Sequence, residues 1–116
     1  MIGENIIWML GGYDLTKAQC LLENTRSLGR KDFMEWQERK IWDIFEFHKK
    51  NNVFYGGKCN STYSRWEEIP VMIKNDFQPG LDKTLSFGFN RGNTYLANTS
   101  GSSGQPFWFA KDKPCH

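Results

Sequence analysis

The stretch that decides the fold is "YLANTSGSSGQPFWFAKDK", which runs from Tyr95 to Lys113. Two segments rich in aromatic and aliphatic residues, Thr94–Ala97 and Phe107–Ala110, predict two β-strands. The nine residues Asn98–Pro106 separate them. A β-hairpin loop normally has about two to five residues, and a longer one is usually functional or disordered. We therefore expect a hairpin whose long loop is exposed, mobile and not helical.

The centre of this loop, "TSGSSGQP", has the composition of a flexible linker and also that of a phosphate-binding loop. Its place between two strands that would pair with each other favours the loop, because a linker joins domains. Gly101 and Gly104 permit positive φ and a close approach of the backbone to a ligand. Successive N–H groups can then converge on phosphate oxygens, and hydroxyls add further donors. The candidate phosphate-binding residues are Thr99, Ser100, Gly101, Ser102, Ser103, Gly104, Gln105 and Pro106.

The flanking residues make the loop more specific. It is not a Walker A loop, since Gln105 follows Gly104, and it is not a G-x-G-x-x-G loop. Instead, "TSGSSGQPFWF" resembles the phosphate-binding signature of the adenylate-forming superfamily, which includes acyl-CoA synthetases, peptide-synthetase adenylation domains and luciferases. Three upstream stretches, together with the loop, resemble the N-terminal region of its phenylacetate–CoA ligase-like branch, which includes capsule-biosynthesis-type homologues. They are Trp36-Gln37, "HKKNNVFY" (His48–Tyr55) and "WEEIPVMIKNDF" (Trp66–Phe77).

The resemblance, which covers the chain from about Asp32 onward, implies a ligase that works in two steps. A carboxylate attacks the α-phosphorus of ATP to give an acyl-adenylate and pyrophosphate, and a thiol, usually that of coenzyme A, then displaces AMP. In the family this loop holds the β- and γ-phosphates, with Mg²⁺ nearby, and Thr99–Gly104 would take that role here. Many members have lysine after the proline, where this chain has Phe107. We therefore expect backbone donors and hydroxyls to carry more of the charge neutralisation.

The length of 116 residues departs from the family, whose members are much longer. Their adenine pocket, ribose-binding aspartate, acyl pocket and catalytic lysine all follow the loop. We therefore expect one partial domain over residues 1–116, inactive by itself, with a helical and irregular part over 1–93. Residues 94–116 would begin the β-structured adenylate-binding core. The sequence does not identify the carboxylic acid substrate, for which an aromatic acid is the first candidate. It also leaves open which acceptor takes the acyl group and how the truncation arose.

The sequence pattern of the N-terminal part predicts helices. We therefore expect a mixed α/β fold that is mostly helical before the hairpin. A short helix at Ile6–Leu10 would close at Gly11-Gly12. The segment Lys17–Leu28 has apolar residues at helical spacing, with Asp14 or Thr16 as cap and Gly29 as its end. The strongest helix is expected from Phe33 to about Lys50, capped by Asp32 with Glu35 in capping-box register.

Beyond Lys50 the pattern breaks at Asn51-Asn52, and residues 53–93 predict mostly loops. Short helical turns are expected at Arg65–Ile69 and from Lys74 or Asn75. No internal repeat is visible. We interpret His48 as a partly buried residue and not as a catalytic one, because no candidate nucleophile lies at a recognisable sequence spacing from it.

The helix over residues 33–48 has apolar residues around more than half of its circumference. They are Phe33, Met34, Trp36, Ile41, Trp42, Ile44, Phe45 and Phe47, opposite one polar stripe of Glu35, Arg39, Asp43, Glu46 and Lys50. Such a helix needs neighbours on several sides, which a missing part of the domain, a partner chain or self-association could provide. The alternative function is therefore a helical interaction module with an incidental loop. A third alternative, a small nucleotide-binding module, is supported by the loop alone.

Composition excludes several other classes. The net charge of +2 gives no basis for nucleic-acid binding. Three widely spaced cysteines, Cys20, Cys59 and Cys115, favour neither a disulfide framework nor a zinc site, and the adjacent Cys115-His116 cannot close one. The apolar run Ile6–Leu10 is too short for a membrane span, and we do not expect it to be a signal peptide. We expect a cytoplasmic protein with small-molecule partners.

Overall fold

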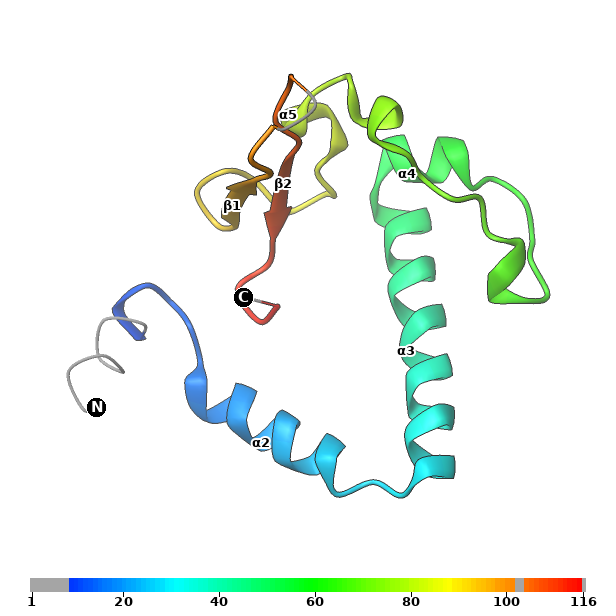
Figure 1. The fold of residues 1–116 in the computed structure, drawn as a ribbon, viewed down its shortest axis with the longest axis vertical. Coiled ribbons are helices and arrows are strands. Elements are labelled where there is room, and N and C mark those ends of the chain that lie inside the picture. Colours follow the sequence, from blue (N-terminus) through cyan, green and yellow to red (C-terminus); the bar gives the residue numbers. More distant parts are fainter. Residues whose placement is uncertain (1–8, 102–103, 116) are drawn as a thin grey trace.

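The computed structural model describes residues 9–101 and 104–115 (Figure 1). The protein is mostly helical, and its described part contains one two-stranded antiparallel sheet, which confirms the mixed class in its coarse form. The elements are α2 (Leu15–Arg26), α3 (Arg30–Asn51), α4 (Val53–Lys58), η1 (Trp66–Glu68), η2 (Lys74–Phe77), α5 (Leu81–Thr84), β1 (Tyr95–Asn98) and β2 (Trp108–Lys111). In Figure 1, α2 and α3 form two arms of an open angle, and the hairpin lies beside α5.

The helices α2 and α3 begin and end differently from the prediction. Asp14 caps α2 as expected, since its carboxylate accepts a hydrogen bond of 2.9 Å from the Lys17 amide. However, α2 ends at Arg26, so the prediction that it continues to Leu28 and ends at Gly29 was wrong. Gly29 instead has extended backbone and directly precedes Arg30, the first residue of α3. Asp32 was predicted as the cap of α3 but lies in its first turn, where a carboxylate interacts favourably with the helix dipole.

The junction of α3 and α4 corrects a second prediction. The chain does break at Asn51-Asn52, but a short helix that the sequence did not predict, α4, follows at once. The rest of residues 53–93 consists of short helical turns and loops, as predicted. Asn52 has extended backbone, and its side-chain oxygen accepts a 2.9 Å hydrogen bond from the Tyr55 amide. The residue that ends one helix therefore caps the next. The helical turns η1 and η2 confirm the two that the sequence predicts, whereas α5 was not predicted.

The hairpin forms as predicted, with each strand one residue later than expected. Tyr95 pairs with Lys111, and Asn98 pairs with Trp108 at the loop end. The Thr99 amide then donates to the Phe107 carbonyl at 3.0 Å, which extends the pairing by one step.

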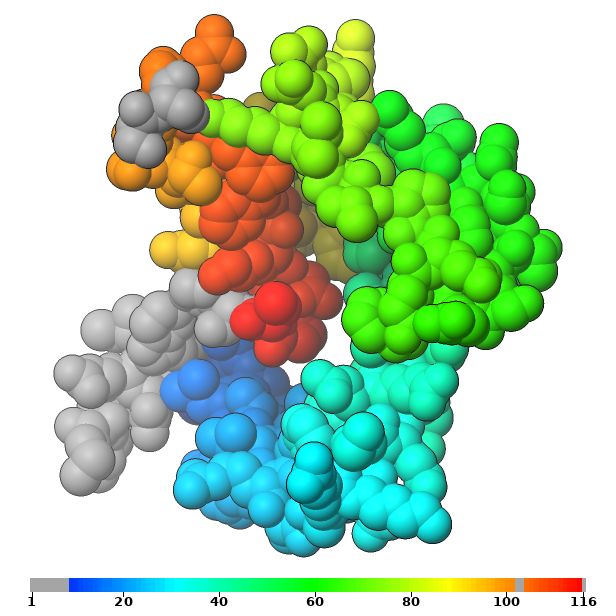
Figure 2. Space-filling model, turned by 45° about the vertical axis from the view of Figure 1, so that its right-hand side comes forward, coloured from blue at the N-terminus to red at the C-terminus, as the bar shows by residue number. Residues whose placement is uncertain are grey.

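The core of the described residues is small. Its buried apolar side chains are Phe45, Cys59 and Leu81. Phe45 makes edge-on contacts with the rings of Tyr55 and Tyr63. The radius of gyration is 16.8 Å, whereas a compact domain of this length would have about 13 Å. Figure 2 shows a deep indentation between the C-terminal segment and the α3 side of the molecule.

Many large apolar side chains stay exposed, and on α3 they include half of the predicted arc. Only Phe45 of that helix is buried, and the covered face is a narrow stripe near its C-terminal end. The described part of the chain therefore does not cover the apolar arc of α3 on the several sides that the sequence analysis expects. None of the helices in residues 9–101 and 104–115 combines the length and the apolar character that crossing a bilayer requires. Examples of exposed apolar residues are Met34, Ile44, Val53, Val71, Ile73 and Phe87.

Candidate functional site

The loop between β1 and β2 is closed at its neck by one residue pair. The Thr99 amide donates to the Phe107 carbonyl, and the Phe107 amide donates to the Thr99 hydroxyl at 2.9 Å. Within the loop, the Gly104 amide donates to the Gly101 carbonyl at 2.9 Å. Gly101 has φ of 70° and Gly104 has φ of 97°, so both use the conformational freedom of glycine.

The candidate residues divide into three groups. Thr99, Ser100, Gly104, Gln105 and Pro106 are exposed, and Gly101 is half-buried. Ser102 and Ser103 lie outside the described residues. The described part of the loop contains no helix, which agrees with the prediction.

The 3₁₀-helix η2 docks against this loop. The Lys74 ammonium donates to the Gln105 carbonyl at 2.6 Å, and the rings of Phe77 and Phe107 pack edge-on with centroids 5.2 Å apart. On its other side, Phe77 contacts the ring of Phe54 on α4. The loop is therefore held by contacts from a segment about thirty residues earlier in the sequence.

The start of η2 is fixed in turn by Asp76. Its carboxylate accepts hydrogen bonds from the Lys58 ammonium at 2.8 Å and from the Ile73 amide at 2.9 Å. The bond from Lys58, followed by that from the backbone, lowers the pKa of Asp76. Sequence reasoning missed Lys74 as a neighbour of the loop, because no spacing rule connects residues 74 and 105.

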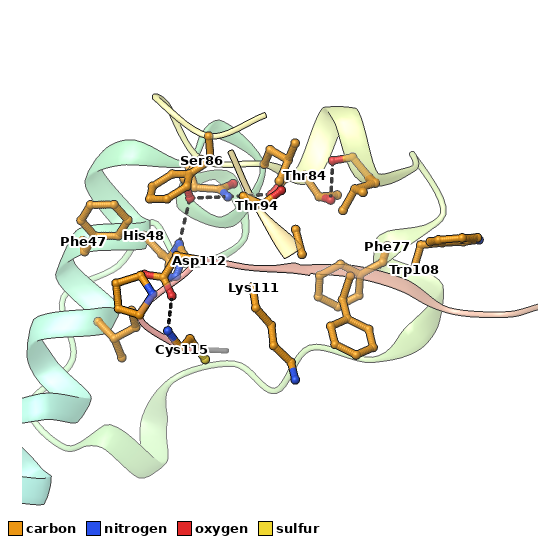
Figure 3. Close-up of a pocket in the computed structure, with 18 of the residues that line it drawn as sticks. Phe47, His48, Phe77, Thr84, Ser86, Thr94, Trp108, Lys111, Asp112 and Cys115 are labelled. Carbon is orange, nitrogen blue, oxygen red and sulfur yellow. Dashed lines mark hydrogen bonds between the residues drawn. The ribbon is translucent and has the colours of Figure 1, made fainter. Parts of the chain in front are cut away.

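A cavity of about 710 Å³ lies between α3, α5 and β2 (Figure 3). Its wall is largely apolar and includes Phe47, Phe77, Leu81, Phe89, Phe107 and Phe109. The polar side chains of His48, Ser86, Lys111 and Asp112 also line it.

Three polar side chains form a connected network beside this cavity. The Asn52 amide nitrogen donates to the Ser86 hydroxyl oxygen at 3.0 Å and to the Thr84 carbonyl at 2.8 Å. The Ser86 oxygen also lies 2.9 Å from Nδ1 of His48. A hydroxyl oxygen has two lone pairs, so the direction of the Ser86–His48 hydrogen bond depends on the tautomer of the imidazole. Burial lowers the pKa of His48, and the negative charge of Asp112 partly opposes this.

This network explains His48 as a structural residue. The pair resembles a serine and its general base in distance, but Ser86 is only 7% exposed and its oxygen already accepts from Asn52. The structure therefore agrees with the interpretation of His48 as partly buried. It also supplies the hydroxyl partner that sequence spacing did not show, 38 residues away.

The described residues contain no cluster of potential metal ligands. No three His, Cys, Asp or Glu side chains within 9–101 and 104–115 lie close enough together to hold an ion. Cys59 is buried, and Cys20 and Cys115 are exposed as free thiols.

Comparison of the chain with models of protein families, with curated proteins and with solved structures found no significant match.

Proposed function

We propose that this chain is the N-terminal part of an ATP-dependent ligase that forms acyl-adenylates. The β1–β2 loop would bind the β- and γ-phosphates of ATP while a carboxylate attacks the α-phosphorus. Acyl-AMP and pyrophosphate result, and the thiol of coenzyme A then attacks the acyl carbon, forms the thioester and displaces AMP. The observation that carries the proposal is the long hairpin loop itself, whose two glycines have positive φ and whose neck is tied by Thr99 and Phe107.

The loop offers chemistry that suits a polyphosphate. Amides of a Gly/Ser turn present N–H donors, which form short, strong hydrogen bonds with charged oxygens. The exposed hydroxyl of Ser100 adds a donor. Mg²⁺ is commonly bound through substrate phosphates and one or two carboxylates, so it does not require a cage built by this chain. A cytoplasmic location goes with the proposal, because ATP and coenzyme A are cytoplasmic cosubstrates.

The open structure supports the view that further polypeptide completes the domain. Exposed apolar side chains such as Ile44, Val71 and Phe87 gain free energy when another surface covers them. In the proposal this surface belongs to the same ligase, and the isolated chain lacks turnover and tends to self-associate. The same exposed residues favour the alternative, a non-enzymatic helical interaction module, whose loop would bind no phosphate.

The test is acid-dependent exchange of pyrophosphate into ATP. The coding sequence downstream of residue 116 is read, and the complete protein is assayed with labelled pyrophosphate and a panel of carboxylic acids, aromatic acids first. Exchange is expected only when the cognate acid is present, because adenylation is reversible and requires the acyl group. A downstream sequence without adenylate-forming motifs, or exchange independent of any acid, would contradict the proposal.

A further inference from the structure

We propose that the cavity between α3, α5 and β2 binds a small organic anion with an aromatic body, and that Lys111 is the partner of its negative charge. The inference goes beyond the proposed function, because it concerns a second ligand site in which no nucleotide takes part. The described residues that line this cavity include none from the candidate phosphate loop, Thr99–Pro106. The cavity volume of about 710 Å³ lies within the range of small-molecule sites, about 300–1,000 Å³.

One wall of the cavity is a row of side chains along β2. Alternate residues of a strand project from the same face about 7 Å apart, so Phe107, just before β2, is followed on this face by Phe109 and Lys111. The two rings stack with centroids 5.9 Å apart, and the Lys111 ammonium lies 5.8 Å from the centroid of Phe109. Phe77 extends the apolar part, because its ring packs edge-on against Phe107. The wall is therefore aromatic at one end and positively charged at the other.

The charge of Lys111 has no carboxylate partner among the described residues. No Asp or Glu side chain within 9–101 and 104–115 forms an ion pair with it, and the half-buried side chain is only partly solvated. The neighbouring Asp112 is engaged elsewhere, since its carboxylate accepts a 3.0 Å hydrogen bond from the Cys115 amide and its charge acts on His48. A ligand anion would supply the missing counter-charge through a charge-assisted hydrogen bond.

The remaining polar side chains of the wall bond to one another. Asn52 donates to Ser86, whose oxygen lies 2.9 Å from Nδ1 of His48. Such a wall, apolar with one charged group to orient the ligand, is typical of small-molecule sites. An aromatic ring of the ligand can stack or pack edge-on against the phenylalanine rings, which is favourable beyond the burial of area. An aromatic body with one negative charge therefore matches the cavity.

The inference is tested with 2-naphthoate, titrated into the ¹⁵N-labelled full chain at low ionic strength, where charge contacts are least screened. The amides of Phe109 and Lys111 report binding, and the Thr99 amide, bonded to the Phe107 carbonyl, reports whether the hairpin is intact. Lys111→Met removes the charge but keeps an apolar stem, and it should weaken binding about tenfold. Lys111→Arg keeps the charge and should bind within about threefold of the wild type. Lys83→Met removes a charge from exposed α5, outside the cavity wall, and is the matched control.

Two further ligands separate the charge from the aromatic body. The neutral 2-naphthalenemethanol has the same rings, and it should bind more weakly than 2-naphthoate and lose no affinity in Lys111→Met. Acetate has the charge without the rings, and it should not shift the amides at the same concentration. Acetate that shifts them as strongly as 2-naphthoate would contradict the aromatic site.

The other outcomes are equally decisive. Equal binding of 2-naphthoate by the wild type and Lys111→Met, or an equal loss in Lys83→Met, would overturn the role of Lys111. Wild-type amides that do not respond would overturn the site itself. An affinity that falls as the chain concentration rises would show that a second copy covers the cavity, which also overturns it. None of these results bears on the phosphate loop, because the assay contains no nucleotide. Lys111→Gln is the second neutral variant, used if the methionine variant opens the hairpin.

Discussion

The side-chain amide nitrogen of Asn52 lies 3.0 Å from the hydroxyl oxygen of Ser86, and both side chains are buried. This bond joins the α3–α4 junction to the segment after α5, 34 residues later. The Phe87 amide, which donates to the Asn51 carbonyl at 2.8 Å, strengthens the same connection. The junction is therefore a polar centre that organises the otherwise small core.

Asn52→Ala should destabilise the chain by about 2–3 kcal/mol. It removes the cap of α4 and leaves the buried Ser86 hydroxyl and the Thr84 carbonyl without their amide donor. Urea unfolding followed by tryptophan fluorescence measures the loss. Asn24→Ala on exposed α2 is the control and should change stability by less than about 0.5 kcal/mol. Equal unfolding midpoints for the two variants would show that the polar centre is not stabilising.

Gly56 and Gly57 are neighbours in α4 that should respond oppositely to alanine. A Cβ at Gly56 would lie 2.6 Å from the Lys49 carbonyl oxygen, so Gly56→Ala must displace backbone and should destabilise by about 1–3 kcal/mol. A Cβ at Gly57 has nothing within 4 Å, so Gly57→Ala should stabilise by up to about 1 kcal/mol. Thermal unfolding of both variants checks this. A stable Gly56→Ala protein would contradict the close packing of α4 on α3.

Stability should fall as the pH drops below about 6.5, the ordinary pKa of histidine. Burial lowers the pKa of His48 in the folded chain. The unfolded chain then binds more protons in this range, and the linkage relation gives stability that rises with pH. Urea midpoints at pH 7.5 and 5.5 measure the effect, which should shrink in His48→Gln. Asp76 and Asp82, whose pKa values are lowered below 3.8, act only in more acidic solution. An unchanged pH response in His48→Gln would contradict this assignment.

The isolated chain should self-associate through its exposed apolar side chains. Sedimentation velocity should show a weight-average mass that rises with concentration. Met34→Glu and Ile44→Glu, both on exposed parts of α3, should reduce this rise, whereas Arg39→Gln on the polar stripe should not. A dilute monomer that unfolds in one sharp, cooperative transition would instead favour the interaction module.

Local signals in the sequence predicted much of the fold. The Asp14 cap, the break at Asn51-Asn52 and the two strands each depend on residues within a few positions of one another. The positive φ of Gly101 and Gly104 follows from the same local chemistry. These features could be predicted because propensity and turn chemistry act over short distances.

The missed features depend on contacts between distant residues. The helix α4 has six residues and two glycines, so its own propensity does not predict it. Its cap donates to the Thr84 carbonyl, 32 residues later. The contacts of Lys74 with Gln105 and of His48 with Ser86 likewise span 31 and 38 residues. Packing decides such pairs, and a single sequence does not display them.

Gly104→Val in the proposed full-length ligase tests the central claim most directly, when the two proposed half-reactions are assayed separately. Gly104 has φ of 97°, which a β-branched residue does not readily adopt, and the added side chain would obstruct phosphate. Pyrophosphate exchange should fall by more than in Ser102→Ala, where loss of one charge-assisted hydrogen bond costs roughly ten- to a hundredfold. Thioester formation from supplied acyl-adenylate should survive, because pyrophosphate has already left. If both half-reactions fell equally in a properly folded Gly104→Val protein, the loop would be structural and would not bind phosphate.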